Sequence, residues 1–228
     1  DLSVGSVAAS AQMAASYVLI VWHGNTLAAV AACFVLGVLA GLFNGLLITR
    51  LRVPDQLATL GTLFLLAGLQ LIPTGGRSLA TGTILPDGTE TTGVFPDAFL
   101  ALGRLRLFDV VPLPVIVLAV LTVVACMLME STRWGRVIYA IGGNIDAARL
   151  SGINVARTKL AVFAINGVMV AIAGLILSSR LGAGSPSAGN IAELDAIAVF
   201  RQRLGRLFGS PGLHRHVEGR RGDGLAFP

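Results

Sequence analysis

Residues 27–48 read LAAVAACFVLGVLAGLFNGLLI, a run without a single charged side chain. A helix of about 20 apolar residues is long enough to cross a bilayer, so this run predicts a membrane-spanning helix. Three glycines at four-residue spacing, Gly37, Gly41 and Gly45, lie on one face of that helix. Small residues let helices approach closely in lipid, and we expect these glycines to pack within the chain rather than to form a specific dimer contact.

Four further apolar runs predict the remaining spans: residues 4–22, 56–72, 111–129 and 160–179. The whole chain is 54% hydrophobic and 13% charged, whereas soluble domains carry about 25% charged residues. The period-2 alternation of a membrane β-barrel is missing. We therefore expect an all-α fold, a polytopic transmembrane helical bundle with about five spans present.

Basic residues in the short loops indicate how the spans are oriented, because cytoplasmic loops are enriched in Lys and Arg. Arg50 and Arg52 follow the second span. Five more basic residues separate the fourth span from the fifth: Arg133, Arg136, Arg149, Arg157 and Lys159. Both loops are then cytoplasmic, and the loop 73–108 lies outside. Its centre, Pro86-Asp87-Gly88, predicts a turn within a small hairpin.

A short helix is predicted over residues 144–151, inside the second basic loop. Asn144 can cap it, Asp146 suits its first turn, and Gly152 can end it. Ala147, Ala148 and Leu150 would give it a small, partly apolar surface beside Arg149. These residues alone leave two interpretations open, a solvated loop helix and a helix seated in the groove of a partner protein.

Several neutral polar side chains fall at or near membrane depth: Asn44, Thr59, Thr62, Gln70 and Asn166. Such groups are costly in lipid unless they are paired or face a watery path. A sugar path is one interpretation, because uncharged donors and acceptors suit a hydroxyl-rich cargo. Hydrogen bonding between helices is common in bundles and is the favoured interpretation for any single residue.

The sequence contains no recognisable set of catalytic residues, no phosphate-binding glycine loop and no residues at metal-ligand spacing. We therefore expect no enzyme activity, no metal and no cofactor held by this chain. A secondary transporter would need an ionisable group inside the membrane for ion coupling. The predicted spans hold no interior Asp, Glu, Lys or Arg, which counts against proton coupling.

Several motifs of the chain are similar to those of one transporter family. Residues 1–6 read DLSVGS, residues 41–54 read GLFNGLLITRLRVP, residues 134–144 read WGRVIYAIGGN, and residues 147–153 read AARLSGI. Together they resemble the permease subunits of bacterial ABC importers for monosaccharides, the ribose, xylose, arabinose and galactose group. The run 158–190 resembles the xylose-transporting members in particular, and the resemblance covers residues 1–198.

The resemblance implies a permease of roughly ten spans in the bacterial inner (plasma) membrane. A second permease subunit, in a homodimer, would complete the sugar path. A periplasmic sugar-binding protein would deliver the cargo, a cytoplasmic ABC ATPase would bind ATP, and no nucleic acid is expected as a partner. Because Asp146-Ala-Ala-x-x-x-Gly152 is similar to the family's Glu-Ala-Ala-x-x-x-Gly pattern, the expected ATPase-coupling loop comprises Gly142, Gly143, Asn144, Asp146, Ala147, Ala148, Arg149 and Gly152.

The chain departs from the family pattern at both ends, and we expect a truncated, frameshifted gene product. About two spans of the family would precede residue 1. After Ala198 the chain carries six arginines against Glu218 and Asp223, where the family continues with an apolar segment. We therefore expect a partial permease domain at 1–198 and an aberrant, disordered basic tail at 199–228. An ATPase-independent secondary transporter and a non-functional remnant are the alternative interpretations.

Overall fold

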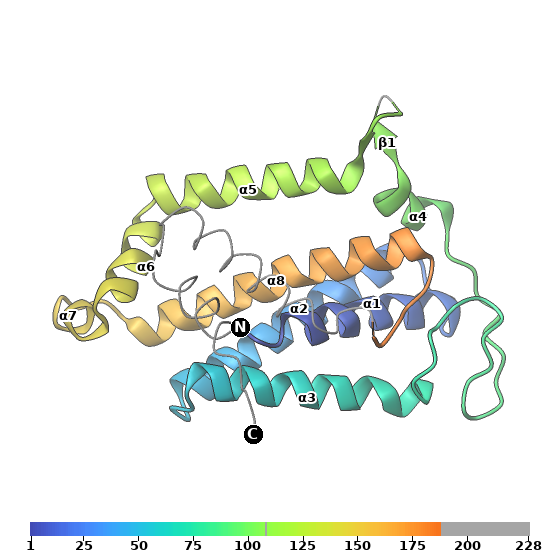
Figure 1. Cartoon of the computed structure of the whole chain (residues 1–228), viewed down its shortest axis with the longest axis horizontal. Coiled ribbons are helices and arrows are strands. Elements are labelled where there is room, and N and C mark those ends of the chain that lie inside the picture. Colours follow the sequence, from blue (N-terminus) through green and yellow to red (C-terminus); the bar gives the residue numbers. More distant parts are fainter. Residues whose placement is uncertain (108, 188–228) are drawn as a thin grey trace, which may run out of the picture. The chain divides into compact units, whose positions relative to one another are not determined.

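The computed structural model describes residues 1–107 and 109–187, and the predicted domain boundary at Ala198 and the tail 199–228 lie outside the described residues. The described chain is mostly helical (Figure 1). Its helices are α1 (Val4–Ile20), α2 (Thr26–Thr49), α3 (Asp55–Thr74), α4 (Asp97–Arg104), α5 (Leu113–Ser131), α6 (Arg133–Gly143), α7 (Ile145–Leu150) and α8 (Val155–Leu181). Two short antiparallel strands, β1 (Arg106–Leu107) and β2 (Val111–Pro112), precede α5.

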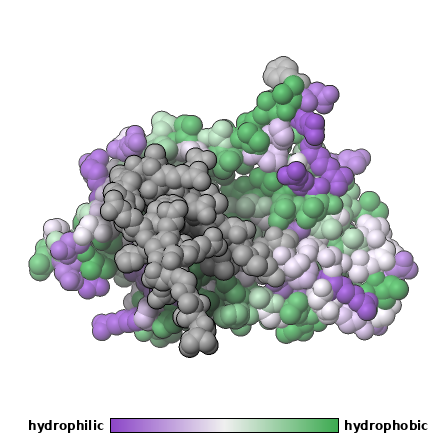
Figure 2. Space-filling model, viewed as in Figure 1, coloured by the Kyte–Doolittle hydropathy of each residue, from purple (hydrophilic) through white to green (hydrophobic). Residues whose placement is uncertain are grey.

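The five predicted spans correspond to helices α1, α2, α3, α5 and α8, and the predicted all-α bundle is confirmed. Four of them, α2, α3, α5 and α8, are long and apolar enough to cross a membrane, whereas α1 has only 17 residues. On the face shown in Figure 2, hydrophobic residues cover the sides of the helices, and polar residues gather toward α6 and toward α4. Helices α4 and α6 and the strand pair were not predicted.

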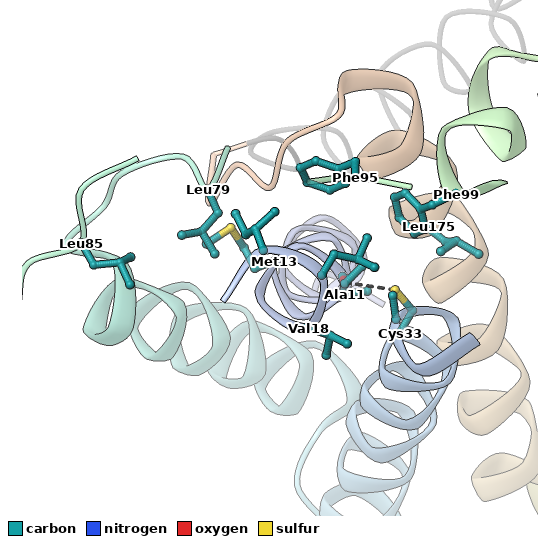
Figure 3. Close-up of a cluster of buried hydrophobic side chains, with 13 residues drawn as sticks. Ala11, Met13, Val18, Cys33, Leu79, Leu85, Phe95, Phe99 and Leu175 are labelled. Atoms are coloured by element: carbon teal, nitrogen blue, oxygen red, sulfur yellow. Dashed lines mark hydrogen bonds between the residues drawn. The ribbon is translucent and has the colours of Figure 1, made fainter. Parts of the chain in front are cut away.

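Helix α1 lies at the centre of the core, in contact with α2, α3 and α8. Small residues such as Ala11 and Ala15 are fully buried, which lets the neighbouring helices come close. Figure 3 shows Phe95 and Phe99 on one side of α1 and Val18 on the other. A helix enclosed by protein in this way need not match the bilayer thickness by itself, which accounts for its shortness.

The glycine face of α2 packs against α8 of the same chain. A side chain at Gly37 would meet the backbone oxygen of Gly167, and one at Gly41 would meet the backbone oxygen of Phe163. At Gly45 a Cβ atom would lie 2.7 Å from a methyl carbon of Leu160. All three predicted packing glycines therefore serve one intramolecular contact, in which the two backbones approach closely.

The loop between α3 and α4 folds over one end of the bundle. Its tip contains the predicted turn: the Leu85 amide donates to the Thr89 carbonyl at 2.9 Å, and Gly88 has φ +84°. An isolated bridge between Ile84 and Glu90 completes a hairpin-like unit. The Thr89 amide also donates to Asp87 Oδ1 at 3.0 Å, which lowers the pKa of that carboxyl group.

The segment that follows α8, residues 182–186, is held from three directions, and we call this arrangement the outer clasp. Leu79 and Gly184 exchange two backbone hydrogen bonds of 2.7 and 2.8 Å. Gln12 Nε2 of α1 donates to the Ala183 carbonyl at 2.8 Å, and Gln70 Nε2 of α3 donates to the Pro186 carbonyl at 3.2 Å. The clasp thereby ties α1, α3, α8 and the loop after α3 together.

Candidate functional site

The predicted coupling residues lie in the connection between α5 and α8, which contains the two short helices α6 and α7. Thr132 begins α6, and its hydroxyl accepts from the Gly135 amide at 3.2 Å. Trp134 and Tyr139 project from α6 with more than half of their surface exposed. Large exposed aromatic side chains outside the apolar spans mark a surface suited to contact another molecule.

The predicted short helix is confirmed as α7, with the predicted cap. Asn144 Oδ1 accepts from the amides of Asp146 and Ala147, both at 3.0 Å. This cap satisfies two of the amides that a helix start leaves without partners. Gly152 follows the helix with φ +81°, a conformation that glycine adopts without a steric penalty.

One side of α7 is anchored and the rest is presented to the surroundings. Ala148 is only 4% exposed, whereas Leu150 is 91% exposed. Arg149 and Asp146 form an exposed ion pair at 3.6 Å. Gly142 and Gly143 end α6 in open space, with no atom near enough to contact an added Cβ. The eight predicted coupling residues therefore lie on one continuous segment, with a free apolar side chain at its end.

A polar cavity of about 610 Å³ lies beside α7, between the turn that joins α2 to α3 and the start of α8. Arg52, Arg149 and Lys159 line it together with Asp55. Lys159 Nζ pairs with Asp55 Oδ2 at 2.9 Å, which ties the start of α8 to the start of α3. One basic residue of the first predicted cytoplasmic loop and two of the second thus lie around the same cavity.

Three of the five predicted path residues join one hydrogen-bond network, which we call the inner network. Asn44 Nδ2 donates to Ser3 Oγ at 2.9 Å, and Thr62 Oγ1 donates to Asn44 Oδ1 at 2.5 Å. Ser3 Oγ donates to Asp1 Oδ1 at 2.6 Å, and Asn166 Nδ2 donates to Asp1 Oδ2 at 2.7 Å. The network joins α2, α3 and α8 to the start of α1.

The other two predicted path residues lie on α3 but outside the inner network. The Thr59 hydroxyl donates to the backbone carbonyl of Asp55 at 3.0 Å, within its own helix. Gln70 donates to the outer clasp, and its Oε1 atom is buried without a hydrogen-bond partner among the described residues. It lines a cavity of about 430 Å³ between α1, α2 and α3.

Sequence reasoning missed several polar residues that precede α1 or lie on it and that the structure brings to these places. Ser3 is central to the inner network, Ser10 lines the cavity beside Gln70, and Gln12 holds the outer clasp. The sequence did contain an indication of them, because polar side chains recur along this short apolar helix. Such a helix must be surrounded by other helices that pair its polar groups.

The family model described as the permease component of the branched-chain amino acid transport system matches residues 1–200. The xylose transport system permease protein XylH of Escherichia coli K12 is 41% identical over 247 residues, covering 87% of this chain and 63% of XylH. The ribose import permease protein RbsC of the same organism is 40% identical over 200 residues, covering 87% of this chain and 59% of RbsC.

XylH of Haemophilus influenzae is 38% identical over 246 residues, with 87% of this chain and 66% of that protein covered. The chain thus spans about three-fifths of the length of the curated relatives it matches. No solved structure matches it. The family match, the similarity to the xylose and ribose permeases and the four apolar helices agree with each other. The chain therefore belongs to this family of transport permeases and is a multi-pass membrane protein.

Proposed function

We propose that the chain is the membrane-spanning permease component of an ATP-driven monosaccharide importer in the bacterial inner membrane. The observation that carries the proposal is α7, a capped short helix on the basic end of the bundle with Leu150 almost fully exposed. An exposed apolar tip on a firmly capped helix suits docking into a groove of another protein. The names of the xylose and ribose relatives support a monosaccharide as the cargo.

In this proposal a cytoplasmic ATPase binds ATP and docks against α6 and α7. The exposed side chains of Tyr139 and Leu150 supply its apolar contacts, and the ion pair of Asp146 with Arg149 lies beside them. A periplasmic sugar-binding protein is received by the loop that carries the hairpin-like unit, at the opposite end of α3 from the basic residues. A second permease subunit completes the path.

The four candidate spans themselves carry no charged residue away from their ends. In the four candidate spans the charged residues stand only near the helix ends, such as Asp55 of α3 and Glu130 of α5. Ion-coupled transporters place ionisable groups near the middle of the membrane. This disfavours ion coupling by the spans themselves, whereas Asp1, which precedes α1 and accepts a hydrogen bond from Asn166 of α8, is a carboxylate outside them.

The proposal is tested by uptake of radiolabelled D-xylose into proteoliposomes with the cognate sugar-binding protein, in the presence and absence of the cognate ATPase. Uptake should require both the ATPase and ATP. Leu150→Asp should reduce uptake at least tenfold without lowering the amount of inserted chain, because Leu150 makes little contact within the chain. The conservative control Leu150→Met should retain most of the uptake.

Two outcomes would contradict this function. ATP-independent uptake driven by an ion gradient would establish the secondary transporter instead. A chain that inserts normally but transports no monosaccharide with any combination of partners would support the non-functional remnant. Full uptake by Leu150→Asp would leave the importer in place and remove α7 from the docking surface.

A further inference from the structure

The polar cavity beside α7, which we call the basic cavity, is lined by more positive than negative side chains. Arg52, Arg149 and Lys159 line it against a single carboxylate, that of Asp55. Its volume of about 610 Å³ falls within the range of about 300–1,000 Å³ that is usual for ligand pockets. A cleft lined by one sign of charge concentrates ions of the opposite sign, so its ligand is expected to be an anion.

Ion pairs within the chain offset only part of this positive charge. Lys159 Nζ donates to both carboxylate oxygens of Asp55, at 3.0 and 2.9 Å, so these two charges balance each other. Arg149 meets Asp146 at 3.6 Å, and both side chains are more than half exposed, so that pair is weak. Arg52 is exposed and forms no ion pair within residues 1–107 and 109–187. Two guanidinium groups of the basic cavity therefore keep donors for an anion.

Three membrane-spanning helices have their ends at the basic cavity. Helix α2 ends at Thr49, α3 begins at Asp55 and α8 begins at Val155, and each of these residues lines the cavity. The ends of helices that cross a bilayer lie close to the polar headgroups. Apolar side chains, among them Ile48 and Val53, share the lining with the basic ones. The cavity thus combines positive charge and apolar surface at the depth where a phospholipid carries its phosphate above its acyl chains.

The predicted orientation of the chain places the basic cavity on the cytoplasmic side. Arg52 comes from the first predicted cytoplasmic loop, and Arg149 and Lys159 come from the second. The cytoplasmic leaflet carries anionic lipids, and basic pockets between transmembrane helices on that side bind their headgroups. A guanidinium group can donate two parallel hydrogen bonds to phosphate oxygens. A free phosphate ion would use these donors but would leave the apolar part of the lining without a partner.

We propose that the basic cavity binds the headgroup phosphate of one anionic phospholipid of the cytoplasmic leaflet. Arg52 and Arg149 donate to the phosphate oxygens, while Ile48 and Val53 contact the glycerol and the first carbons of an acyl chain. Arg52 lies between α2 and α3, and Arg149 lies on α7. One bound lipid therefore links the connection between α2 and α3 to α7. The site goes beyond the importer function and does not depend on it.

The test is native mass spectrometry of the full chain released from detergent micelles, without any ATPase or sugar-binding protein. Phosphatidylglycerol is titrated against phosphatidylcholine with the same acyl chains. Both lipids have a phosphate, but the choline group of phosphatidylcholine carries a compensating positive charge. The expected result is saturable retention of one phosphatidylglycerol molecule, with phosphatidylcholine bound about tenfold more weakly because it brings no net charge.

A pair of double variants separates the basic cavity from general charge. Arg52→Gln with Arg149→Gln should weaken phosphatidylglycerol binding about fivefold for each arginine removed. The matched control is Arg50→Gln with Arg157→Gln, which removes the same charge from the same two loops at exposed positions that do not line the cavity. The control should bind within about twofold of the parent, because salt screens exposed charges away from the ligand. Circular dichroism checks that both variants keep the helical content of the parent.

Three outcomes would overturn the lipid site. Equal losses in the two double variants would show that only the overall charge of the loops matters. Equal affinity for phosphatidylglycerol and phosphatidylcholine would show that the positive charge does not select the ligand. Complete displacement of phosphatidylglycerol by millimolar inorganic phosphate would assign the cavity to free phosphate. None of these readouts involves sugar uptake, so the importer function is judged separately.

Discussion

The inner network and the cavity between α1, α2 and α3 contain similar polar side chains but differ in whether these side chains are hydrogen-bonded. Both gather polar side chains inside an apolar bundle, and the inner network also includes the carboxylate of Asp1. In the inner network, the hydroxyls and amides of Ser3, Asn44 and Thr62 are hydrogen-bonded to one another. In the cavity, Ser10 Oγ and Gln70 Oε1 have no hydrogen-bond partner within residues 1–107 and 109–187. Paired groups hold the helices in place, whereas a buried oxygen without a partner contributes no such bond, so hydrogen bonding distinguishes the two regions better than residue type does.

The largest effect on stability is expected from a substitution that forces α2 away from α8, because the inner network includes residues of both helices. Gly41→Leu places a side chain against the backbone of Phe163, where there is no room. We expect a loss of about 3 kcal/mol in the free energy of unfolding, by analogy with severe overpacking in other cores. The measurement is an unfolding titration with SDS in mixed micelles, followed by circular dichroism.

Gly68→Leu is the matched control for that variant. Gly68 lies in α3 and has no atom within contact distance of an added Cβ. Its replacement should leave stability within about 1 kcal/mol of the parent, or raise it, because leucine is the better helix former. Equal losses at Gly41 and Gly68 would show that the contact between α2 and α8 does not stabilise the bundle.

A middle-sized effect is expected within the inner network itself. Asn44→Leu keeps the side chain roughly the same size but removes hydrogen bonds to both Ser3 and Thr62. The free energy of unfolding should fall by about 1–2 kcal/mol, in line with hydrogen bonds between membrane helices. Thr122→Val on the exposed face of α5 removes only a bond to its own helix and should cost less. No difference between the two variants would mean that the network is not stabilising.

The smallest effect should distinguish the two regions most sharply, because two serines of α1 can be compared directly. Ser16 is buried, and its hydroxyl donates to the Gln12 carbonyl at 3.0 Å and lies 3.2 Å from Ser178 Oγ. Ser10 is buried too, but its hydroxyl has no hydrogen-bond partner in the part of the chain that the structure describes. Ser16→Ala should lower the free energy of unfolding by about 1 kcal/mol, whereas Ser10→Ala should leave it unchanged or slightly raise it. If thermal unfolding showed the same loss of stability for both variants, paired and unpaired serines of α1 would not differ in their contribution.

Local features of this protein followed from the sequence wherever a short-range rule decides the structure. The apolar runs predicted the long helices, and Asn144 with Gly152 predicted the two ends of α7. Helix α6 escaped prediction, although its Thr132 cap follows the same rule, because its arginines and glycine lie between two stronger signals. Short amphipathic segments of this kind depend on the helices around them.

The partners of the individual polar residues could not be predicted from the sequence, because they depend on which faces of the helices pack against each other. Asn44, Thr59 and Gln70 look alike in the sequence, yet one joins α1, one bonds its own helix and one lines a cavity. Their fates are decided by the rotation of α2 and α3 against α1, which is a tertiary property. Hydropathy reports that a segment is buried in the membrane but not what each of its side chains faces.

The outer clasp also imposes an order on biosynthesis. Gln70 and the Pro186 carbonyl that it holds are 116 residues apart in the chain, and a ribosome adds about 5–20 residues each second. For several seconds after α3 has emerged, Leu79 in the loop after α3 and the side-chain amide of Gln70 therefore lack the segment 182–186 to which they bond. The outer end of the bundle stays open until α8 has crossed the membrane. Arrest of synthesis before that point would leave an inserted intermediate without the outer clasp, whose loop after α3 is open to proteases on that side of the membrane.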